Sequence, residues 1–294
     1  MIIQLENVKF IYKSTSFSGH HTKHNPCEIT ALENINLSIN KGEFVTVIGP
    51  NSSGKSTFAK LLNALLIPTS GRVIINNLDT CNMDNLYKIR QNAGMVFQNP
   101  ENQIIGSTIE EDVAFGLENL GLLKSIMNER IEYALKVVHM EHMRKVSPYD
   151  LSGGQKQKLA IAGVIAMQPE IIVFDEPTAL LDPVSCEEII ELIGILNNKH
   201  NITIILITQN MEEVVFAKRI IVFNKGSIYL DGLPEEILSL KKVRELRSFG
   251  LELPGLAMLS EQLINKGFGL KDLIFNKEKL LEQIITRKYH DRIL

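Results

Sequence analysis

Two runs of apolar residues are too continuous for an amphipathic helix. Residues 170–175 read EIIVFD and residues 202–208 read ITIILIT, and each run follows a stretch in which apolar positions recur with helical spacing. Strands buried on both faces of a parallel sheet are continuously apolar. The alternation therefore predicts an α/β fold, with a parallel sheet covered by helices on both faces.

Shorter patterns predict further elements. Strands are expected at residues 2–10, 32–48 (interrupted by the turn sequence NKGE), 72–75 and 93–97. Helical spacing runs from Ser56 to about Leu66, over most of residues 100–165, and from about residue 240 to the end. The polar stretch 13–28 carries Gly and Pro and is expected to form an exposed loop.

Composition narrows the class of protein. The chain has 294 residues, with 45% hydrophobic residues and a net charge of −3, which fits a globular protein and gives no basic field for nucleic acid. Its three cysteines are odd in number and far apart, which favours reduced thiols in a cytosol. No apolar run approaches the roughly 20 residues that span a bilayer. The chain is therefore not expected to cross a membrane itself, although a partner can hold it there.

The sequence GPNSSGKST at residues 49–57 matches the phosphate-binding pattern G-x-x-x-x-G-K-[ST]. A predicted strand precedes it and a predicted helix follows, as the pattern requires. Backbone N–H groups and the positive helix end favour phosphates, Lys55 adds a charge for the β- and γ-phosphates, and the Ser56 hydroxyl can bind Mg²⁺. The predicted nucleotide-binding residues are Gly49, Pro50, Asn51, Ser52, Ser53, Gly54, Lys55, Ser56 and Thr57.

The apolar run at residues 171–174 ends in two acids, Asp175 and Glu176. A buried strand would bring Asp175 to the Mg²⁺ side of the phosphates. Glu176 is then the candidate general base for the attacking water, a role whose loss typically costs about 10²–10⁴ in rate. The alternative interpretation is a strand end that carries two solvated acids.

The sequence LSGGQKQKLAIA at residues 151–162 provides a second glycine-rich helix start that favours an anion. A second phosphate-binding helix start is redundant within one chain and makes sense if it serves the nucleotide of another subunit. With these motifs the chain resembles the ABC ATPase family over residues 1–240. The resemblance implies a P-loop NTPase cassette with a RecA-like core, an antiparallel β subdomain, a helical signature subdomain at about 100–165, and a C-terminal helical dimerisation domain at 241–294.

The resemblance also implies roles for individual residues. The chain would pair head to tail with a second ATPase chain, either the same or a homologous one, around two ATP molecules. The signature residues Ser152, Gly153, Gly154 and Gln155 would then touch the γ-phosphate held by the opposite chain, with Asp182 beside them. Gln98 matches the glutamine that approaches Mg²⁺ and the attacking water and links the site to the membrane partner. Tyr12 matches the aromatic residue that stacks on adenine; the alternative is a strand aromatic packed for burial.

Within the family, residues 95–122 (MVFQNPENQIIGSTIEEDVAFGLENLGL) resemble the ATPases of energy-coupling-factor importers, which take up cobalt, nickel or vitamins. Residues 243–268 resemble the short C-terminal domain of those ATPases, which helps to hold their dimer. The resemblance implies a transmembrane coupling subunit and a substrate-binding membrane subunit as partners. It also implies a peripheral position on the cytoplasmic face of the cell membrane.

Two residues depart from the family pattern. Gln209 follows the predicted strand at 202–208, where most members have a histidine that contacts the γ-phosphate. An amide donates a hydrogen bond but carries no charge and shuttles no proton, so slower hydrolysis is expected. Ser52 stands where the family usually has glycine; a positive φ there would cost about 1–2 kcal/mol.

These departures leave other functions open. One alternative is a cassette that closes on ATP, hardly turns over and regulates an assembly. Another is an ABC protein of repair or translation, although such proteins usually carry two cassettes or a large insertion.

The cluster His20, His21, His24 and Cys27 is a candidate metal site, because imidazole and thiolate suit zinc or cobalt. Its spacing matches no strong template, and a plain exposed loop is the alternative.

Overall fold

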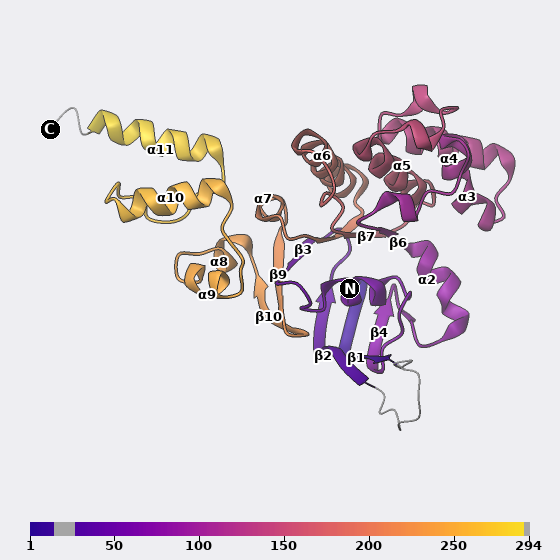
Figure 1. The fold of residues 1–294 in the computed structure, drawn as a ribbon, viewed down its shortest axis with the longest axis horizontal. Helices are drawn as coiled ribbons and strands as arrows, with labels where there is room; N and C mark the ends of the chain where they lie inside the picture. Colours follow the sequence, from indigo (N-terminus) through magenta and orange to yellow (C-terminus); the bar gives the residue numbers. More distant parts are fainter. Residues whose placement is uncertain (15–26, 291–294) are drawn as a thin grey trace, which may run out of the picture.

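The computed structural model describes residues 1–14 and 27–290, which form two sheets flanked by helices (Figure 1). The larger sheet has the strand order β10-β9-β3-β8-β7-β6, and the smaller one has the order β2-β1-β4-β5. The strands are β1 (Ile3–Ser14), β2 (Cys27–Ile39), β3 (Phe44–Ile48), β4 (Ser70–Ile75), β5 (Leu78–Asp79), β6 (Ala93–Val96), β7 (Ile171–Asp175), β8 (Thr203–Ile207), β9 (Arg219–Asn224) and β10 (Ser227–Gly232).

The α-helices separate into groups along the chain. They are α1 (Lys55–Leu62), α2 (Leu86–Asn92), α3 (Ile109–Asn119), α4 (Lys124–Val137), α5 (Gly153–Ala166), α6 (Pro183–His200), α7 (Met211–Val214), α8 (Pro234–Ile237), α9 (Val243–Ser248), α10 (Gly255–Asn265) and α11 (Lys277–His290). Helices α3, α4 and α5 gather at one end of the molecule, and α10 and α11 lie at the other (Figure 1).

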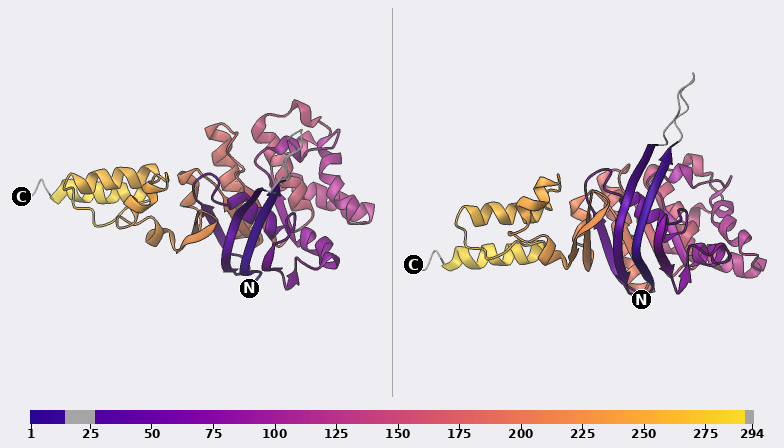
Figure 2. Two further views of the ribbon diagram at one scale, coloured as in Figure 1. Left: turned by 60° about the horizontal axis from the view of Figure 1, so that its bottom comes forward. Right: turned by 90° about the horizontal axis from the view of Figure 1, so that it is seen from below.

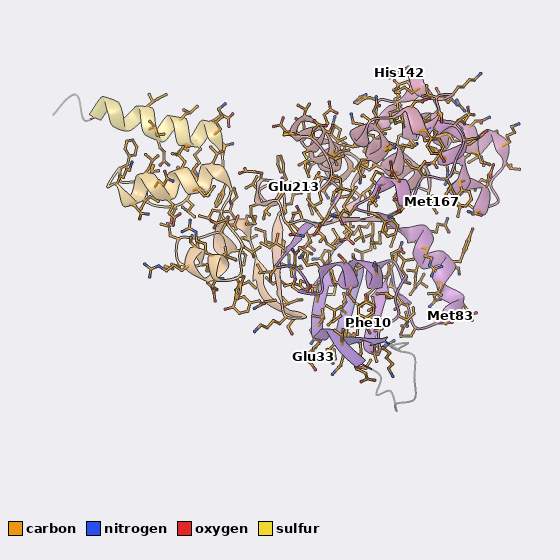
Figure 3. The ribbon with its side chains drawn as sticks, in the orientation of Figure 1. Phe10, Glu33, Met83, His142, Met167 and Glu213 are labelled. Atoms are coloured by element: carbon orange, nitrogen blue, oxygen red, sulfur yellow. The ribbon has the colours of Figure 1, made fainter. Side chains whose placement is uncertain are left out.

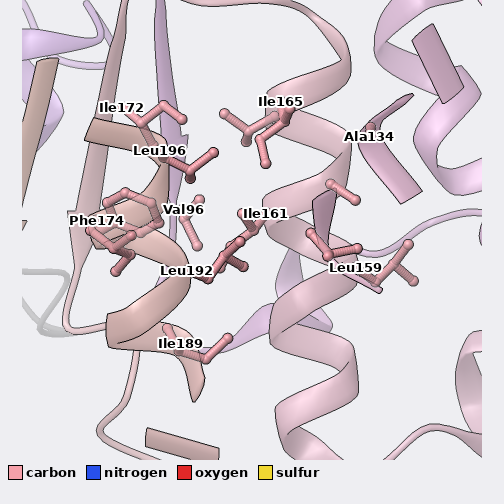
Figure 4. Packing of buried hydrophobic residues seen from close by; sticks show 14 of the residues in the cluster. Val96, Ala134, Leu159, Ile161, Ile165, Ile172, Phe174, Ile189, Leu192 and Leu196 are labelled. Atoms are coloured by element: carbon pink, nitrogen blue, oxygen red, sulfur yellow. The ribbon is translucent and has the colours of Figure 1, made fainter. Parts of the chain in front are cut away.

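The parallel part of the larger sheet is buried on both faces, as the continuous apolar runs predict. Alternate residues of β7 enter different cores: Ile172 and Phe174 pack with α5 and α6, whereas Ile171 and Val173 pack with α1 and the smaller sheet. Figure 4 shows Phe174 beside Leu192 of α6, with Val96 of β6 near Ile161 of α5. This double burial fixes the carboxyl ends of the strands, where the polar residues of the site follow.

The smaller sheet is antiparallel and packs on the α1 side of the larger one. Strand β1 pairs with both β2 and β4, and the buried side chains of all three strands share one core with Phe58 and Leu61 of α1. Phe10 and Glu33 lie on this sheet in Figure 3. The phosphate loop leads from β3 into α1. Because α1 packs on the smaller sheet, the loop lies close to that sheet.

The C-terminal helices begin on the core and end away from it. Leu246, Leu253 and Ala257 pack with Met211 and Val222 in one cluster that joins α9 and α10 to β9 and α7. A separate small cluster, which includes Leu270, Ile274 and Leu280, packs α10 against α11. The two views in Figure 2 show α10 and α11 side by side, projecting from the two sheets.

Several boundaries differ from the sequence predictions. Helix α1 ends at Leu62 instead of about Leu66, because Ala64 adopts a φ of 54° and the amides of Leu65 and Leu66 donate to Lys60. Strand β1 extends to Ser14 and β2 begins at Cys27, so the predicted loop 13–28 was too long. Among the described residues, every helix is too short or too polar to cross a bilayer.

Candidate functional site

The phosphate loop joins β3 to α1 through a strained backbone. Ser52 has a φ of 61°, so serine occupies the left-handed region that the sequence analysis treated as the costly case. Gly54 precedes the helix with a φ of 104°, and a Cβ atom there would come within 2.6 Å of the carbonyl oxygen of Ala31. Glycine is therefore required at position 54, while position 52 tolerates serine at a cost.

Lys55 points its ammonium group at the mouth of this loop. Its Nζ donates to the carbonyl oxygens of Gly49 and Pro50, at 2.7 and 2.9 Å, and the side chain is buried. Burial lowers the pKa of Lys55, while the charges of Glu176 and Asp175 oppose that shift. The ammonium group is thus held between the phosphate loop and the two acids after β7.

The Ser53 hydroxyl is buried in the same loop, and its Oγ has no hydrogen-bond partner among the described residues. Buried polar atoms are rarely left unpaired without a reason. A phosphate oxygen placed in the loop would supply the missing partner. The loop therefore fits an anion in a way that its sequence pattern alone did not show.

Ser56 and Asp175 meet at the end of β7. The Ser56 Oγ donates to Asp175 Oδ1 at 3.0 Å, as expected for two residues that share one metal site. Burial raises the pKa of Asp175 despite that hydrogen bond, and the nearby Glu176 raises it further. A hydroxyl and a carboxylate in contact form a donor set of hard oxygens that suits Mg²⁺, and a cation there would offset the cost of burying the carboxylate.

Glu176 and Gln209 form a hydrogen-bonded pair. The amide Nε2 of Gln209 donates to Glu176 Oε1 at 2.5 Å, and Glu176 adopts a φ of 52°. Non-glycine residues in this region of φ cluster at functional sites, where surrounding structure holds them in place. Since Gln209 occupies Oε1, the second oxygen of Glu176 is left to accept the proton of a water molecule.

Glu213, which the sequence analysis did not identify, fastens the two loops that carry this pair. Its buried Oε1 accepts hydrogen bonds from Thr178 Oγ1 and from Asn210 Nδ2, at 2.5 and 3.1 Å. Thr178 lies two residues after Glu176, and Asn210 lies one residue after Gln209. Figure 3 shows Glu213 on α7, between the central sheet and the C-terminal helices. An acid in the first turn of a short helix gave no signal of this role.

The signature residues form the N-terminus of α5. Ser152 is the N-cap: its Oγ accepts from the amide of Gln155, and its own amide donates to Gln155 Oε1, which completes a capping box. Gly154 packs against α6, where an added Cβ atom would lie 2.5 Å from Ser185 Oγ. Asp182 caps α6 by accepting from the amides of Val184 and Ser185. The exposed residues Ser152, Gly153 and Asp182 therefore share one surface.

No hydrogen bond within the described residues joins this signature surface to the phosphate loop of the same chain. By contrast, Lys55, Ser56, Asp175, Glu176 and Gln209 are joined by hydrogen bonds or by direct charge interactions. These five predicted site residues are therefore brought together within a single chain. The signature group and Asp182 remain on a separate, exposed face.

Tyr12 contacts the phosphate loop, whereas Gln98 follows β6, which pairs in parallel with β7. The Tyr12 hydroxyl lies 3.2 Å from Thr57 Oγ1, its ring meets Phe10 edge-on at 4.8 Å, and 40% of the residue is exposed. That exposure leaves ring surface on which a base can stack. Gln98 is exposed just after β6. His20, His21 and His24 of the cluster considered for zinc or cobalt lie outside the described residues. Among the residues that the structure describes, no three or more His, Cys, Asp or Glu side chains form a group that could hold a metal ion.

Residues 32–179 match the family model for ABC transporters. The chain is 48% identical to an energy-coupling factor transporter ATP-binding protein, EcfA1, of Caldanaerobacter subterraneus, over 96% of this chain and 98% of that protein. It is 44% identical to the protein of the same name from Clostridioides difficile, with the same coverage. This chain belongs to the ABC transporter family. Within it, the chain belongs with the energy-coupling factor ATP-binding proteins.

Solved structures agree with this assignment. CbiO1 from Clostridium perfringens, described as part of the ABC transporter complex CbiONQ, has a TM-score of 0.71 and 32% identity over 88% of this chain and 98% of CbiO1. The dimeric ATP-binding cassette MJ0796, bound to ADP and phosphate, has a TM-score of 0.68 and 34% identity over 79% of this chain and 98% of MJ0796. The expected fold and the expected class, an ATP-binding ATPase coupled to transport, are confirmed. The comparisons do not favour the regulatory-cassette alternative.

Proposed function

We propose that this chain is the ATP-hydrolysing subunit of an energy-coupling-factor importer that takes up a metal ion or a vitamin. The observation that carries the proposal is the joined group at the ends of β3, β7 and β8, in which Asp175, Glu176 and Gln209 lie beside Lys55 and Ser56 of the phosphate loop. Homologues that share nearly the whole length of the chain are named as transporter ATP-binding proteins, which supports the same function.

In this proposal ATP binds with its phosphates in the loop 49–57 and its adenine on the Tyr12 ring. Lys55 and the loop amides would hold the β- and γ-phosphates. Ser56, Asp175 and Gln98 would hold Mg²⁺, whose charge would offset that of the phosphate oxygens. Glu176 accepts the proton of the attacking water through the oxygen that Gln209 leaves open. Gln209 orients the Glu176 carboxylate and does not itself exchange a proton.

Two chains would complete each site. The signature residues Ser152, Gly153, Gly154 and Gln155, of which Ser152 and Gly153 are exposed, would meet the γ-phosphate on the opposite chain, with Asp182 next to them. The C-terminal segment 241–294 would strengthen this pairing as a second domain, since α10 and α11 form their own small core and leave Met258, Leu259, Leu281 and Ile285 partly exposed. The dimer would lie on the cytoplasmic face of the membrane, against a transmembrane coupling subunit and a substrate-binding subunit.

The direct test is ATP hydrolysis by the purified chain over a range of protein concentrations, with Glu176→Gln as the control. The proposal predicts a rate that rises more than linearly with protein concentration, because each active site needs two chains, and a control that binds ATP but hydrolyses at least ~100-fold more slowly. A rate strictly proportional to protein concentration, at concentrations where the chain is monomeric, would contradict the composite site.

A further inference from the structure

Gln98 lies between two points at which its segment is held by α5, the helix that begins at the signature. On one side, Gln157 Nε2 donates to the carbonyl oxygen of Phe97 at 3.3 Å. On the other side, Lys156 Nζ forms an ion pair with Glu101 Oε1 at 2.6 Å. Because both anchors come from the first turns of one helix, the Gln98 segment and the signature are fastened to the same rigid element.

Hydrogen bonds within residues 95–103 would carry the position of α5 through the whole segment. The amide of Phe97 donates to Gln103 Oε1 and Gln103 Nε2 donates to the carbonyl of Met95, while the Asn99 side chain accepts from the amide of Glu101. The loop is thus closed on itself from Met95 to Gln103, a span that contains both anchors. A movement of α5 would displace the whole loop and not just its ends.

Gln157 is an unusual residue for its position. It is fully buried, one turn after Gly154 and one turn before Ile161 on the inner face of α5, where apolar side chains are the rule. Its Oε1 has no hydrogen-bond partner within the described residues, although the atom is buried. A buried amide with one satisfied and one unsatisfied end costs stability, so a packing role alone does not account for it.

We propose that Gln157 and Lys156 are positioning residues that couple the two ATP sites of the dimer. This inference rests on the proposed function, in which the signature contacts the nucleotide of the opposite chain and Gln98 contacts the Mg²⁺ of its own. When the signature engages the partner's γ-phosphate, α5 sets the position of Gln98 through the Phe97 carbonyl and the Glu101 carboxylate. Each site thereby aligns the metal-binding glutamine of the other.

The test compares Gln157→Met and Lys156→Met with Lys158→Met. Lys158 lies on the same helix and has a similarly buried side chain (21% exposed, against 18% for Lys156). Its ion pair is of similar length, 2.7 Å against 2.6 Å, but is formed with Glu188 of α6. The measurement is the Mg²⁺ concentration that gives half-maximal ATP hydrolysis at saturating ATP. This quantity does not change when a variant merely loses part of its folded population.

Gln157→Met and Lys156→Met should raise this Mg²⁺ concentration about fivefold, the factor expected for one lost hydrogen bond. The KM for ATP should stay unchanged, because the phosphate loop is untouched, and Lys158→Met should match the wild type. The double variant Lys156→Glu with Glu101→Lys should return the Mg²⁺ requirement to within about twofold of the wild type, because it restores the opposite charges. An unchanged Mg²⁺ requirement in Gln157→Met, or an equal rise in Lys158→Met, would overturn the proposal.

A second readout separates this inference from the proposed function. Hydrogen–deuterium exchange of the amides of residues 97–103 needs no hydrolysis. In the Glu176→Gln background, addition of ATP should slow this exchange, and Gln157→Met should abolish the slowing while ATP still binds. If the wild type hydrolyses no ATP but the exchange result holds, the hydrolytic function fails and the coupling stands; if ATP leaves the exchange of 97–103 unchanged, the coupling fails.

Discussion

Gln209 replaces the histidine usual in this family with an amide that already has a partner in Glu176. Because the amide is neutral, its hydrogen bond to a phosphate oxygen is about half as strong as that of a charged imidazole. It also cannot move a proton. Because Glu176, the proposed general base, is present, the slowing of hydrolysis should be modest.

We expect Gln209→His to raise kcat about fivefold at saturating ATP, because a charge-assisted contact to the γ-phosphate replaces a neutral one. The gain should grow as the pH falls toward about 6.5, where histidine becomes charged. Steady-state hydrolysis across this pH range checks the prediction, with Gln209→Ala as a control that should be slower than the wild type. A Gln209→His variant no faster than the wild type would show that the substitution does not limit the reaction.

At the scale of elements, the N-termini of α5 and α6 touch at Gly154 and Ser185. A Cβ atom at position 154 would lie 2.5 Å from Ser185 Oγ and 2.8 Å from Ser185 Cβ, so Gly154→Ala should lower the free energy of unfolding by about 1–3 kcal/mol. Gly163 lies on the same helix, and a Cβ atom added there would meet no neighbour within 4 Å, so Gly163→Ala should raise the free energy of unfolding by up to about 1 kcal/mol. Denaturant unfolding of both variants checks the pair, and equal effects would contradict the packing described.

The cap of α6 predicts a pH dependence. The Ser185 hydroxyl and the backbone amides of the first turn hold the pKa of Asp182 below its ordinary value. A carboxyl whose pKa is lower in the folded state stabilises the fold above the ordinary aspartate pKa of about 3.9, and that stabilisation is lost as the pH falls through the lowered value.

Asp182→Asn keeps an acceptor for the cap but removes the titration. The difference in free energy of unfolding between the wild type and this variant should therefore shrink as the pH falls below about 4. Urea unfolding of both proteins over the acid range measures it. Asp84→Asn is the control, because Asp84 lies inside the short 3-10 helix Met83–Asn85, which is capped by Asn82. A difference that grows on acidification would have the wrong sign for a capping carboxylate.

Several elements could be predicted because their signals are local. The apolar runs at 171–174 and 203–207 gave β7 and β8, and the phosphate-loop pattern gave the junction of β3 and α1. Helix α2 and the short strand β5 were missed, because α2 buries only Ile89 and β5 has two residues. Their formation depends on tertiary contacts that a hydrophobic pattern does not encode.

The residues around the site also divide into those that a local sequence signal predicted and those that depend on the fold. The residues with a motif, such as Lys55 and Glu176, were found from sequence, and their contacts follow from strand ends that meet at one edge of a parallel sheet. Glu213 and Gln157 act through partners 35 and 60 residues away. A glutamine on the buried face of α5 was a readable signal, but its partner could be identified only once the fold had brought β6 beside α5.

At the scale of the whole molecule, the chain presents two incomplete halves of one site. The phosphate loop with Glu176 and Gln209 forms one half, and the exposed signature surface at Ser152 and Gly153 forms the other. The head-to-tail dimer is the arrangement that joins them. It also explains why a single chain carries two glycine-rich helix starts.

Complementation between two inactive variants tests this account most directly. Lys55→Ala disables the phosphate loop, and Gly153→Asp places a negative charge on the signature at a position where an added side chain meets nothing closer than Leu181 at 3.6 Å. The measurement is ATP hydrolysis at saturating Mg²⁺, where a misaligned Gln98 does not limit the rate, by each variant alone and by an equal mixture. The account predicts that the mixture recovers about one quarter of the wild-type activity, since half of the random dimers are mixed and each holds one intact site. A mixture as inactive as its components would contradict the shared site.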